Sequence, residues 1–234
     1  LKQGTDAAAF MSMGHVALKE FHIDKQDPYF TDYVRKYTDL PMQLMLRKQG
    51  DRYVSGRFLR ASDFADNMGE DNNPEWKTVV YDARSKAFVV PNGSVGFRWG
   101  EEGKWNLLEK GGAEQSEIEA ELSCIDNKDE VVAVDFPHFT PDEGDTLTRN
   151  IPVRKLKLVS GEKVLVCSVF DLQVAQYGID RGLGDNLATS YDDDSVPYKI
   201  GRASWSERVL MGWGAGCGIC VGGGGGGGVG GGGG

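Results

Sequence analysis

Hydrophobic residues in the first part of the chain recur at the spacing of a helix. In residues 5–23 the apolar side chains fall at intervals of three and four positions, which places them on one face of a predicted helix. This predicted apolar face consists of Phe10, Met13, Ala17 and Phe21. Thr5 suits the cap of the helix, and Asp6 suits the positive end of its first turn.

A second, shorter helix is predicted for residues 28–37. Asp27 belongs to the residue types preferred at an N-terminal cap, and Pro28 is favoured at the first helical position. The predicted apolar face of this helix consists of Tyr29, Phe30, Tyr33 and Val34. The chain is therefore expected to open on a helical segment.

Beyond residue 39 the spacing changes to the alternation that is typical of strands. The predicted strands are 40–46, 53–59, 77–81, 87–90, 117–124, 153–158 and 163–170. The turns around Gly50 and Gly161 predict hairpins, and so does the short gap between the third and fourth strands. A final helix is predicted for residues 172–177, with Gly178 at its end.

This order of elements predicts an α/β fold with a β-rich antiparallel insertion, because helices are followed by a run of short strands and then by a strand-to-helix return. Residues 1–39 form the predicted helical segment of the α/β domain. Residues 40–170 form the predicted insertion, and residues 171–198 return to the α/β domain.

Residues 199–234 are expected to have a different origin. From Gly222 to Gly234 every residue except Val229 is Gly, so this stretch has nothing to bury and is predicted to be a disordered Gly-rich tail. Lys199 to Ser204 corresponds to the translation of a common sequencing adapter, and a poly-G read would give the glycine run. We interpret the tail as an artefact and expect natural sequence to end near Tyr198.

The charge and the hydropathy of the chain restrict its function further. The formal net charge of −9 argues against a general affinity for nucleic acid or for anionic lipid. No run of about 18 apolar residues occurs, so no direct membrane span is expected. The sequence starts at Leu1 without Met or a signal peptide, which indicates an internal fragment.

The cysteines and histidines predict no metal site. Cys124 and Cys167 lie far apart in strand-like segments and are expected to be buried, reduced thiols. Cys217 and Cys220 resemble half of a metal motif, but they lie in the tail and are given no metal. The seven-residue separation of His15 and His22 is wrong for a metal pair on one helix, so helix packing or surface hydrogen bonding is the expected role. The arginines of the predicted first hairpin and its end suit either an anion patch or a solvated face. They are Arg47, Arg52, Arg57 and Arg60.

The start of the first predicted helix is the strongest candidate for binding. Gly4 lets a ligand approach the backbone closely, and the free N–H groups at a helix start favour an anion. Asp6 can accept hydrogen bonds from a ribose hydroxyl or a guanine edge. An ordinary capped helix start is the alternative that the residues alone favour.

Several segments in the same order resemble one protein family. They are Lys2–Ala8, Met13–Val16, Tyr29–Arg35, Asn72–Lys77, Pro91–Gly100 and Ala188–Asp193. Over residues 1 to about 198 the chain resembles the alpha subunits of respiratory nitrate reductases, which are molybdopterin-dependent oxidoreductases of the DMSO reductase superfamily. This resemblance implies an internal fragment of a much longer catalytic subunit.

The resemblance also implies a cofactor and residues that contact it. The expected cofactor is molybdenum bis(molybdopterin guanine dinucleotide), at which an oxygen atom is removed from nitrate to give nitrite. Gly4, Thr5 and Asp6 would contact a guanine dinucleotide arm, with Gln3 as a weaker neighbour. The ligands of the molybdenum and of a 4Fe–4S cluster are expected outside this chain. No catalytic residue and no metal ligand is therefore assigned here, and the isolated chain is expected to be inactive.

Partners and location follow from the same resemblance. The expected partners are an iron–sulfur beta subunit and a membrane gamma subunit that oxidises quinol. The expected location is the cytoplasmic face of the membrane as a peripheral subunit, with an extracytoplasmic orientation left open. Two alternatives stay open: a selenate or chlorate reductase fragment, and a non-catalytic β-rich module that contacts an electron-transfer subunit.

Overall fold

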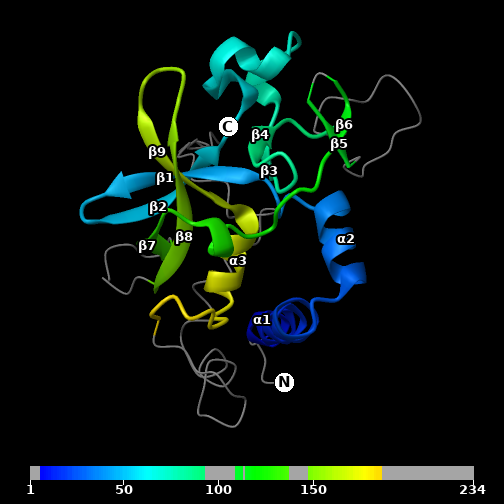
Figure 1. Ribbon diagram of the computed structural model, residues 1–234. Coiled ribbons are helices and arrows are strands. Elements are labelled where there is room, and N and C mark those ends of the chain that lie inside the picture. Colours follow the sequence, from blue (N-terminus) through cyan, green and yellow to red (C-terminus); the bar gives the residue numbers. More distant parts are fainter. Residues whose placement is uncertain (1–5, 93–108, 113, 137–146, 186–234) are drawn as a thin grey trace, which may run out of the picture.

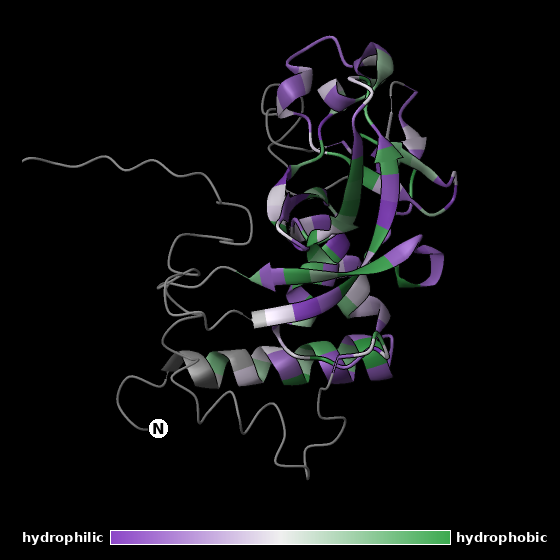
Figure 2. Ribbon diagram, turned by 90° about the vertical axis from the view of Figure 1, so that its left-hand side faces the viewer, coloured by the Kyte–Doolittle hydropathy of each residue, from purple (hydrophilic) through white to green (hydrophobic). Residues whose placement is uncertain are grey.

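The computed structural model describes residues 6–92, 109–112, 114–136 and 147–185 (Figure 1). Helix α1 (Asp6–Ala17) continues directly into η1 (Leu18–Asp24), a turn of the wider π-helix. The two form one rod along the bottom of the molecule (Figure 2). Helix α2 (Pro28–Tyr37) follows, capped by the Asp27 side chain, which accepts a hydrogen bond from the Tyr29 N–H. Both predicted helices are confirmed.

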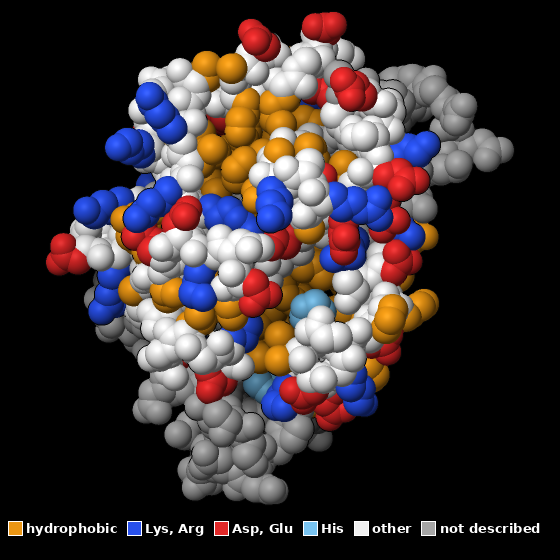
Figure 3. Space-filling model, viewed as in Figure 1, with side chains coloured by type: hydrophobic (Ala, Val, Ile, Leu, Met, Phe, Trp, Pro, Cys, Tyr) orange, Lys and Arg blue, Asp and Glu red, His pale blue; other side chains and the backbone are white. Residues whose placement is uncertain are grey.

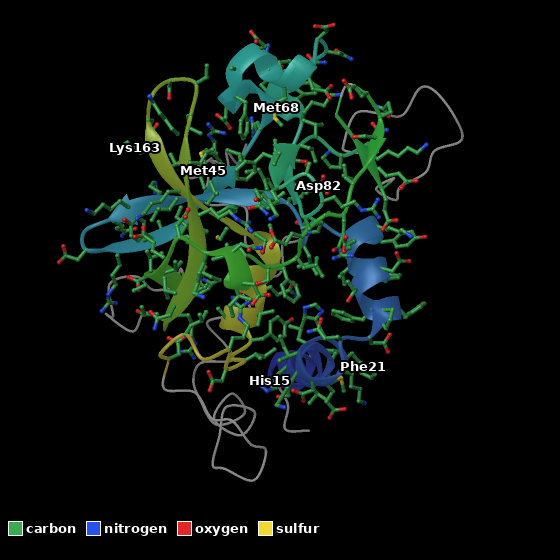
Figure 4. All side chains as sticks on the ribbon, in the orientation of Figure 1. His15, Phe21, Met45, Met68, Asp82 and Lys163 are labelled. Atoms are coloured by element: carbon green, nitrogen blue, oxygen red, sulfur yellow. The ribbon has the colours of Figure 1, made fainter. Side chains whose placement is uncertain are left out.

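The predicted apolar face of the first helix is wrong. Phe10 and Met13 are 69% and 64% exposed, and Phe21 is also exposed. The side that packs on the rest of the molecule carries His15, Leu18 and His22, all buried. Figure 4 labels His15 and Phe21 on different sides of the helix. Sequence spacing failed here because two histidines, counted as polar, occupy buried positions.

The centre of the molecule is a small closed barrel with strand order β1-β2-β7-β8-β9. Its strands are β1 (Gln43–Gln49), β2 (Arg52–Phe58), β7 (Glu130–Phe136), β8 (Leu147–Lys157) and β9 (Lys163–Ser168). The β1–β2 and β8–β9 hairpins confirm the predicted turns around Gly50 and Gly161. The sheet is mixed, and not wholly antiparallel as expected, because β2 and β7 pair in parallel. These two strands are distant in sequence, so no hairpin turn forces them to be antiparallel.

The long connection between β2 and β7 holds shorter elements. They are η2 (Ala61–Asp63), η3 (Ala65–Gly69), η4 (Pro74–Trp76), β3 (Val80–Asp82), β4 (Ala87–Val89), β5 (Lys110–Gly111), β6 (Ser116–Glu117) and η5 (Ile125–Asn127). Strands β3 and β4 form the predicted antiparallel hairpin. The end of the predicted return segment and the whole predicted tail, from residue 186 onward, lie outside the described residues.

The predicted strand 117–124 forms only in part. Residues 116–117 belong to β6, and the rest is extended chain whose Ile118, Ala120 and Leu122 side chains are buried as the alternation predicted. The Asp82 carboxylate secures this segment by accepting a hydrogen bond from the Glu119 N–H at 2.7 Å. A side chain thus replaces part of the missing strand ladder.

Helix α3 (Val169–Gln176) lies between the barrel and the helical rod (Figure 1). Leu172 and Ala175 pack into the barrel core, whereas Val169 and Phe170 pack with residues of the rod and of α2. The helix starts three residues earlier than predicted because the Ser168 hydroxyl accepts a hydrogen bond from the Asp171 N–H and caps it. Burial on both sides makes α3 the common core of the fold.

The two described cysteines are buried and free, as predicted. The Cys124 thiol donates a hydrogen bond to the Pro152 carbonyl oxygen at 3.1 Å. Burial raises the pKa of the Cys124 thiol, and it raises that of Cys167 as well. Both thiols therefore stay protonated at neutral pH and act as small apolar side chains.

We expect Asp82→Ala to lower the free energy of unfolding by about 1–3 kcal/mol, because it removes a buried acceptor and leaves several partly buried N–H groups without a partner. The Asp82 carboxylate also accepts hydrogen bonds from the Ser85 N–H and hydroxyl and from the Arg84 N–H. Urea unfolding at neutral pH measures the effect. Asp71→Ala, at an exposed carboxylate, is the control and should change the unfolding free energy by less than about 0.5 kcal/mol.

The pH dependence tests the same contact. Burial alone would raise the pKa of Asp82, but the hydrogen bonds from Ser85 and from the Glu119 backbone outweigh it and hold the pKa below its ordinary value. A depressed folded-state pKa stabilises the fold above the unfolded pKa, and this stabilisation is lost as the pH falls through the folded pKa. The difference in unfolding free energy between wild type and Asp82→Ala should therefore shrink in acid; an unchanged difference would contradict the assignment.

Candidate functional site

The predicted cofactor contacts lie at the start of α1. The helix begins at Asp6, close to the predicted cap. Gln3, Gly4 and Thr5 lie outside the described residues, and only the backbone of Asp6 is described. The first N–H groups of a helix have no acceptor within it and form its positive end. The structure thus places helix α1, at whose start the predicted contacts lie, and contacts of Gly14 and His15 hold this helix in position.

Gly14 brings α1 into direct contact with the end of α3. A Cβ atom at this position would lie 2.3 Å from the Cε1 atom of the Tyr177 ring. Real carbon atoms never approach so closely, and Tyr177 is buried, so the ring has little room to move. Gly14 is therefore required by packing, and it sets the distance between the two helices.

His15 fixes the same contact with a hydrogen bond. Its Nδ1 atom lies 2.7 Å from the Tyr177 carbonyl oxygen, and the side chain is 4% exposed. Because a carbonyl oxygen only accepts, Nδ1 carries the proton in this arrangement. The neighbouring Gly178 has a φ of +73°, a left-handed conformation that ends α3 and turns the chain away. Gly14 and His15 together fasten the rod to α3.

His22 lies about two helical turns farther along the rod, between aromatic rings. Its ring centroid lies 4.7 Å from that of Phe170 in an edge-to-face arrangement, and 5.7 Å from that of Phe30. Burial lowers the pKa of His22, and the nearby guanidinium groups of Arg181 and Arg35 lower it further. The imidazole is therefore neutral at pH 7 and serves as packing, as the sequence predicted.

A buried carboxylate ties α3 to two other segments. Asp171 is fully buried, and Arg181 donates to its Oδ1 atom at 2.6 Å from the chain that follows α3. The Ser123 hydroxyl donates to the same atom at 2.6 Å, and the Cys124 N–H donates to Oδ2 at 3.1 Å. The Ser168 hydroxyl also reaches Oδ2. This network holds residues 123–124, α3 and Arg181 in one arrangement.

A cleft of about 440 Å³ opens between η1, α2 and residues 121–126. Figure 3 shows histidine atoms within a hollow on this face. Arg181 in its wall is neutralised by Asp171, and Arg35 lies 3.3 Å from Glu119. Glu121 is held by Arg154. Because most of its charges are already paired, the cleft has the character of a packing surface.

The described residues hold no metal site. No three His, Cys, Asp or Glu side chains in this part of the chain come together as metal ligands. The start of α1 offers backbone N–H donors of the kind that suit a phosphate group.

Comparison with known proteins finds relatives that match nearly nine-tenths of the chain. The chain is 47% identical over 218 residues to the respiratory nitrate reductase 1 alpha chain of Escherichia coli (strain K12), covering 89% of this chain and 17% of that protein. It is 39% identical over 209 residues to the nitrate reductase alpha chain of Bacillus subtilis (strain 168), covering 89% of this chain and 16% of that protein. The chain is homologous to a segment of nitrate reductase alpha chains.

A third relative agrees. The nitrate reductase alpha subunit of Mycobacterium tuberculosis (strain ATCC 25618 / H37Rv) is 42% identical over 212 residues, covering 88% of this chain and 16% of that protein. No protein-family profile matches the chain. The chain spans about a sixth of the length of these curated relatives. The predicted resemblance is thus confirmed, as a match to a small part of each nitrate reductase alpha chain.

The residues that support the site were partly missed by sequence reasoning. In the sequence, Met13–Val16 counted only as a segment that resembles the family. In the structure, Gly14 and His15 of this segment contact Tyr177. Tyr177, Asp171 and Arg181 were not singled out. One available signal was the acidic residue inside the apolar sequence 169–175, since a carboxylate there needs a buried partner.

We expect Gly14→Ala to destabilise the protein by about 1–3 kcal/mol, because the added methyl group overlaps the Tyr177 ring. The higher helix propensity of Ala would offset only about 0.5–1 kcal/mol of this cost. Urea unfolding measures the change, and Met13→Ala at the exposed neighbour is the control, expected within about 0.5 kcal/mol of wild type. Combining Gly14→Ala with Tyr177→Leu should recover part of the loss; a purely additive double variant would refute the contact.

We expect Arg181→Leu to cost about 3–5 kcal/mol of stability, because Asp171 is left as a buried charge without its cation. Arg84→Leu is the matched control, since Arg84 forms an exposed ion pair with Glu117 at 3.2 Å and such pairs contribute about 0–1 kcal/mol. Thermal or urea unfolding compares the two. Equal effects of the two substitutions would show that Asp171 does not depend on Arg181.

Proposed function

We propose that this chain is part of the catalytic alpha subunit of a nitrate reductase, which reduces nitrate to nitrite. The observation that carries the proposal is the 38–47% identity to nitrate reductase alpha chains over nearly nine-tenths of the chain. Such identity along a collinear stretch implies a shared fold in the longer protein. When bound, the molybdenum bis(molybdopterin guanine dinucleotide) cofactor supplies the oxygen-atom and electron transfer.

The role we assign to this segment is to frame that cofactor. The backbone N–H groups at the start of α1 bind a phosphate of one guanine dinucleotide arm, helped by the positive end of the helix. Gly4 and Thr5 bring the backbone close, Asp6 accepts hydrogen bonds from the polar edge of the nucleotide, and Gln3 lies beside them. The Gly14 and His15 contacts with Tyr177 support this role because they hold the helix in place.

The chemistry itself belongs to other parts of the longer polypeptide. We place the ligands of the molybdenum and of a 4Fe–4S cluster there. In this proposal α1, η1 and α2 belong to an α/β domain, and the barrel is an insertion within it. The segment binds and orients the cofactor and has no catalytic residue of its own.

Partners and location complete the proposal. We expect an iron–sulfur beta subunit and a quinol-oxidising gamma subunit in the parent complex, with the alpha subunit held peripherally at the cytoplasmic face of the membrane. Within the described part of the chain, no helix has the length and apolar character needed to cross a bilayer.

An interaction role is the second candidate, favoured by the exposed face of α2. Tyr29, Tyr33 and Tyr37 are 77%, 51% and 53% exposed, and their rings follow one another at centroid distances of 6.4 and 5.0 Å. Tyrosines are enriched where proteins meet. Such a contact is compatible with the cofactor role, because the tyrosines belong to α2 and the proposed cofactor contacts lie at the start of α1.

The experiment that tests the enzyme assignment is expression of the complete parent gene with its neighbouring subunit genes. Nitrate should reoxidise the dithionite-reduced complex, and the purified complex should contain molybdenum. A molybdenum-free complex that leaves nitrate untouched would overturn the proposal and would favour the interaction role.

The cofactor role is tested separately by Asp6→Ala in the complete alpha subunit. We expect molybdenum content to fall at least about fivefold, because a lost contact of about 1–3 kcal/mol lowers cofactor retention. Asp27→Ala is the matched control: this carboxylate also caps a helix, so its loss should cost about 1 kcal/mol of stability and leave molybdenum content unchanged. Equal molybdenum in both variants would argue against the assigned contact.

A further inference from the structure

The two long hairpins of the barrel separate to form an open wedge. Strands β1 and β9 pair from Gln43–Ser168 to Leu46–Leu165 and no farther. Yet β1 runs on to Gln49, and β9 begins at Lys163. Residues 47–49 and 163–164 therefore face each other across a gap without ladder hydrogen bonds. We call this gap the hairpin wedge, lined by residues 45–48, 53, 56–57, 158 and 162–165.

The hairpin wedge has a volume of about 420 Å³, and its floor is apolar. Its apolar lining consists of Met45, Leu46, Tyr53, Leu158, Val164 and Leu165. Met45, Leu46 and Leu158 are almost fully buried, whereas Tyr53, Val164 and Leu165 retain exposed surface. Figure 4 labels Met45 and Lys163 close to one another where the β8–β9 hairpin rises away from β1.

The rim is basic although the whole chain carries a net charge of −9. Arg47, Lys48 and Lys163 line the wedge and are exposed, and none of them forms an ion pair in the described part of the chain. By contrast, Arg52 and Arg57 on β2 are matched with Asp135 and Asp63. Figure 3 shows blue side chains over these hairpins beside an orange hollow. Of the arginines that the sequence offered for an anion patch, Arg47 thus lies on this rim, whereas Arg52 and Arg57 are matched by carboxylates.

One cross-strand pair opposes folding stability. Lys157 and Lys163 are direct partners in the β8–β9 ladder, and like charges directly opposite one another destabilise a hairpin. Among the described residues that line the wedge, Glu162 is the one with a carboxylate. Lys163 lines the wedge, and an acidic partner bound there would offset this repulsion.

We propose that the hairpin wedge binds an extended, acidic and partly apolar peptide segment of another polypeptide. Alternate side chains of a strand point to opposite faces, so one set reaches the apolar floor while carboxylates on the other set meet the basic rim. The backbone of the segment pairs with the open edges of β1 and β9. This inference is independent of the proposed cofactor role, because the wedge lies on the barrel.

The shape of the wedge favours a peptide over the other polyanions. A membrane surface needs projecting apolar side chains, but the apolar groups here lie at the bottom of a recess. Nucleic acid binding needs a larger excess of positive charge than three cations on an acidic chain can give. Open strand edges recognise backbone amide groups, which neither a lipid nor a nucleic acid presents in this way.

Binding of a defined peptide to the complete 234-residue chain tests the proposal. The probe is a capped, fluorescently labelled peptide that alternates Glu and Leu over about six residues, the usual length of a strand. Anisotropy titration should show saturable binding that weakens with salt, and the charge reversal Arg47→Glu with Lys163→Glu should reduce affinity about tenfold or more. Lys86→Glu, at an exposed turn outside the wedge, is the matched control and should change affinity less than about twofold.

A second pair of peptides separates ladder pairing from simple charge attraction. Methylating alternate backbone nitrogens of the probe removes its ladder donors and should weaken binding about tenfold, while a Lys–Leu peptide should not bind. Equal binding of all peptides, or of wild type and the doubly reversed variant, would overturn the proposal. So would binding of phosphatidylglycerol vesicles that depends on Arg47 and Lys163, since it would make the wedge a lipid contact. Circular dichroism checks that the variants fold.

Discussion

The buried carboxylate of Asp171 is the group on which the arrangement of the molecule depends. It lies in α3, which, among the described helices, contributes side chains both to the barrel core and to the cluster between the barrel and the helical rod. Its charge is held by Arg181 and by donors from residues 123 and 124. A charge buried so deeply is tolerated only when its partners are in place, so the barrel, the rod and the chain after α3 take up their positions together.

The contact between α1 and α3 carries that order to the proposed cofactor site. Gly14 lets α1 approach the Tyr177 ring at the end of α3, and His15 donates a hydrogen bond to the Tyr177 carbonyl oxygen. The start of α1 is therefore held by the same buried unit that closes the barrel. A helix start can bind a ligand with little loss of entropy only if its position is fixed beforehand, and this contact supplies the fixation.

Sequence patterns predicted most elements but not which helix face is buried. The hairpins around Gly50 and Gly161 followed from turn chemistry and alternation, both of which act locally. The face of α1 depended on His15 and His22, whose burial is made possible by the Tyr177 carbonyl and the Phe170 ring, both far away in sequence. The parallel pairing of β2 with β7 was missed for the same reason. At the candidate site, the helix start was predicted from local residue types. The contact of α1 with Tyr177 and the pairing of Asp171 with Arg181 were not visible in any local pattern.

The parallel pairing of Tyr53 and Val54 with Val134 and Asp135 joins strands whose connection includes η2 through η5 and two small sheets. The entropy of closing so long a connection grows only with the logarithm of its length, so doubling it would cost about 0.6 kcal/mol. The barrel therefore sets few limits on how many residues this connection contains. Evolution can lengthen or shorten it among relatives, and reshape the surface it forms, while the strands that close the ring stay unchanged.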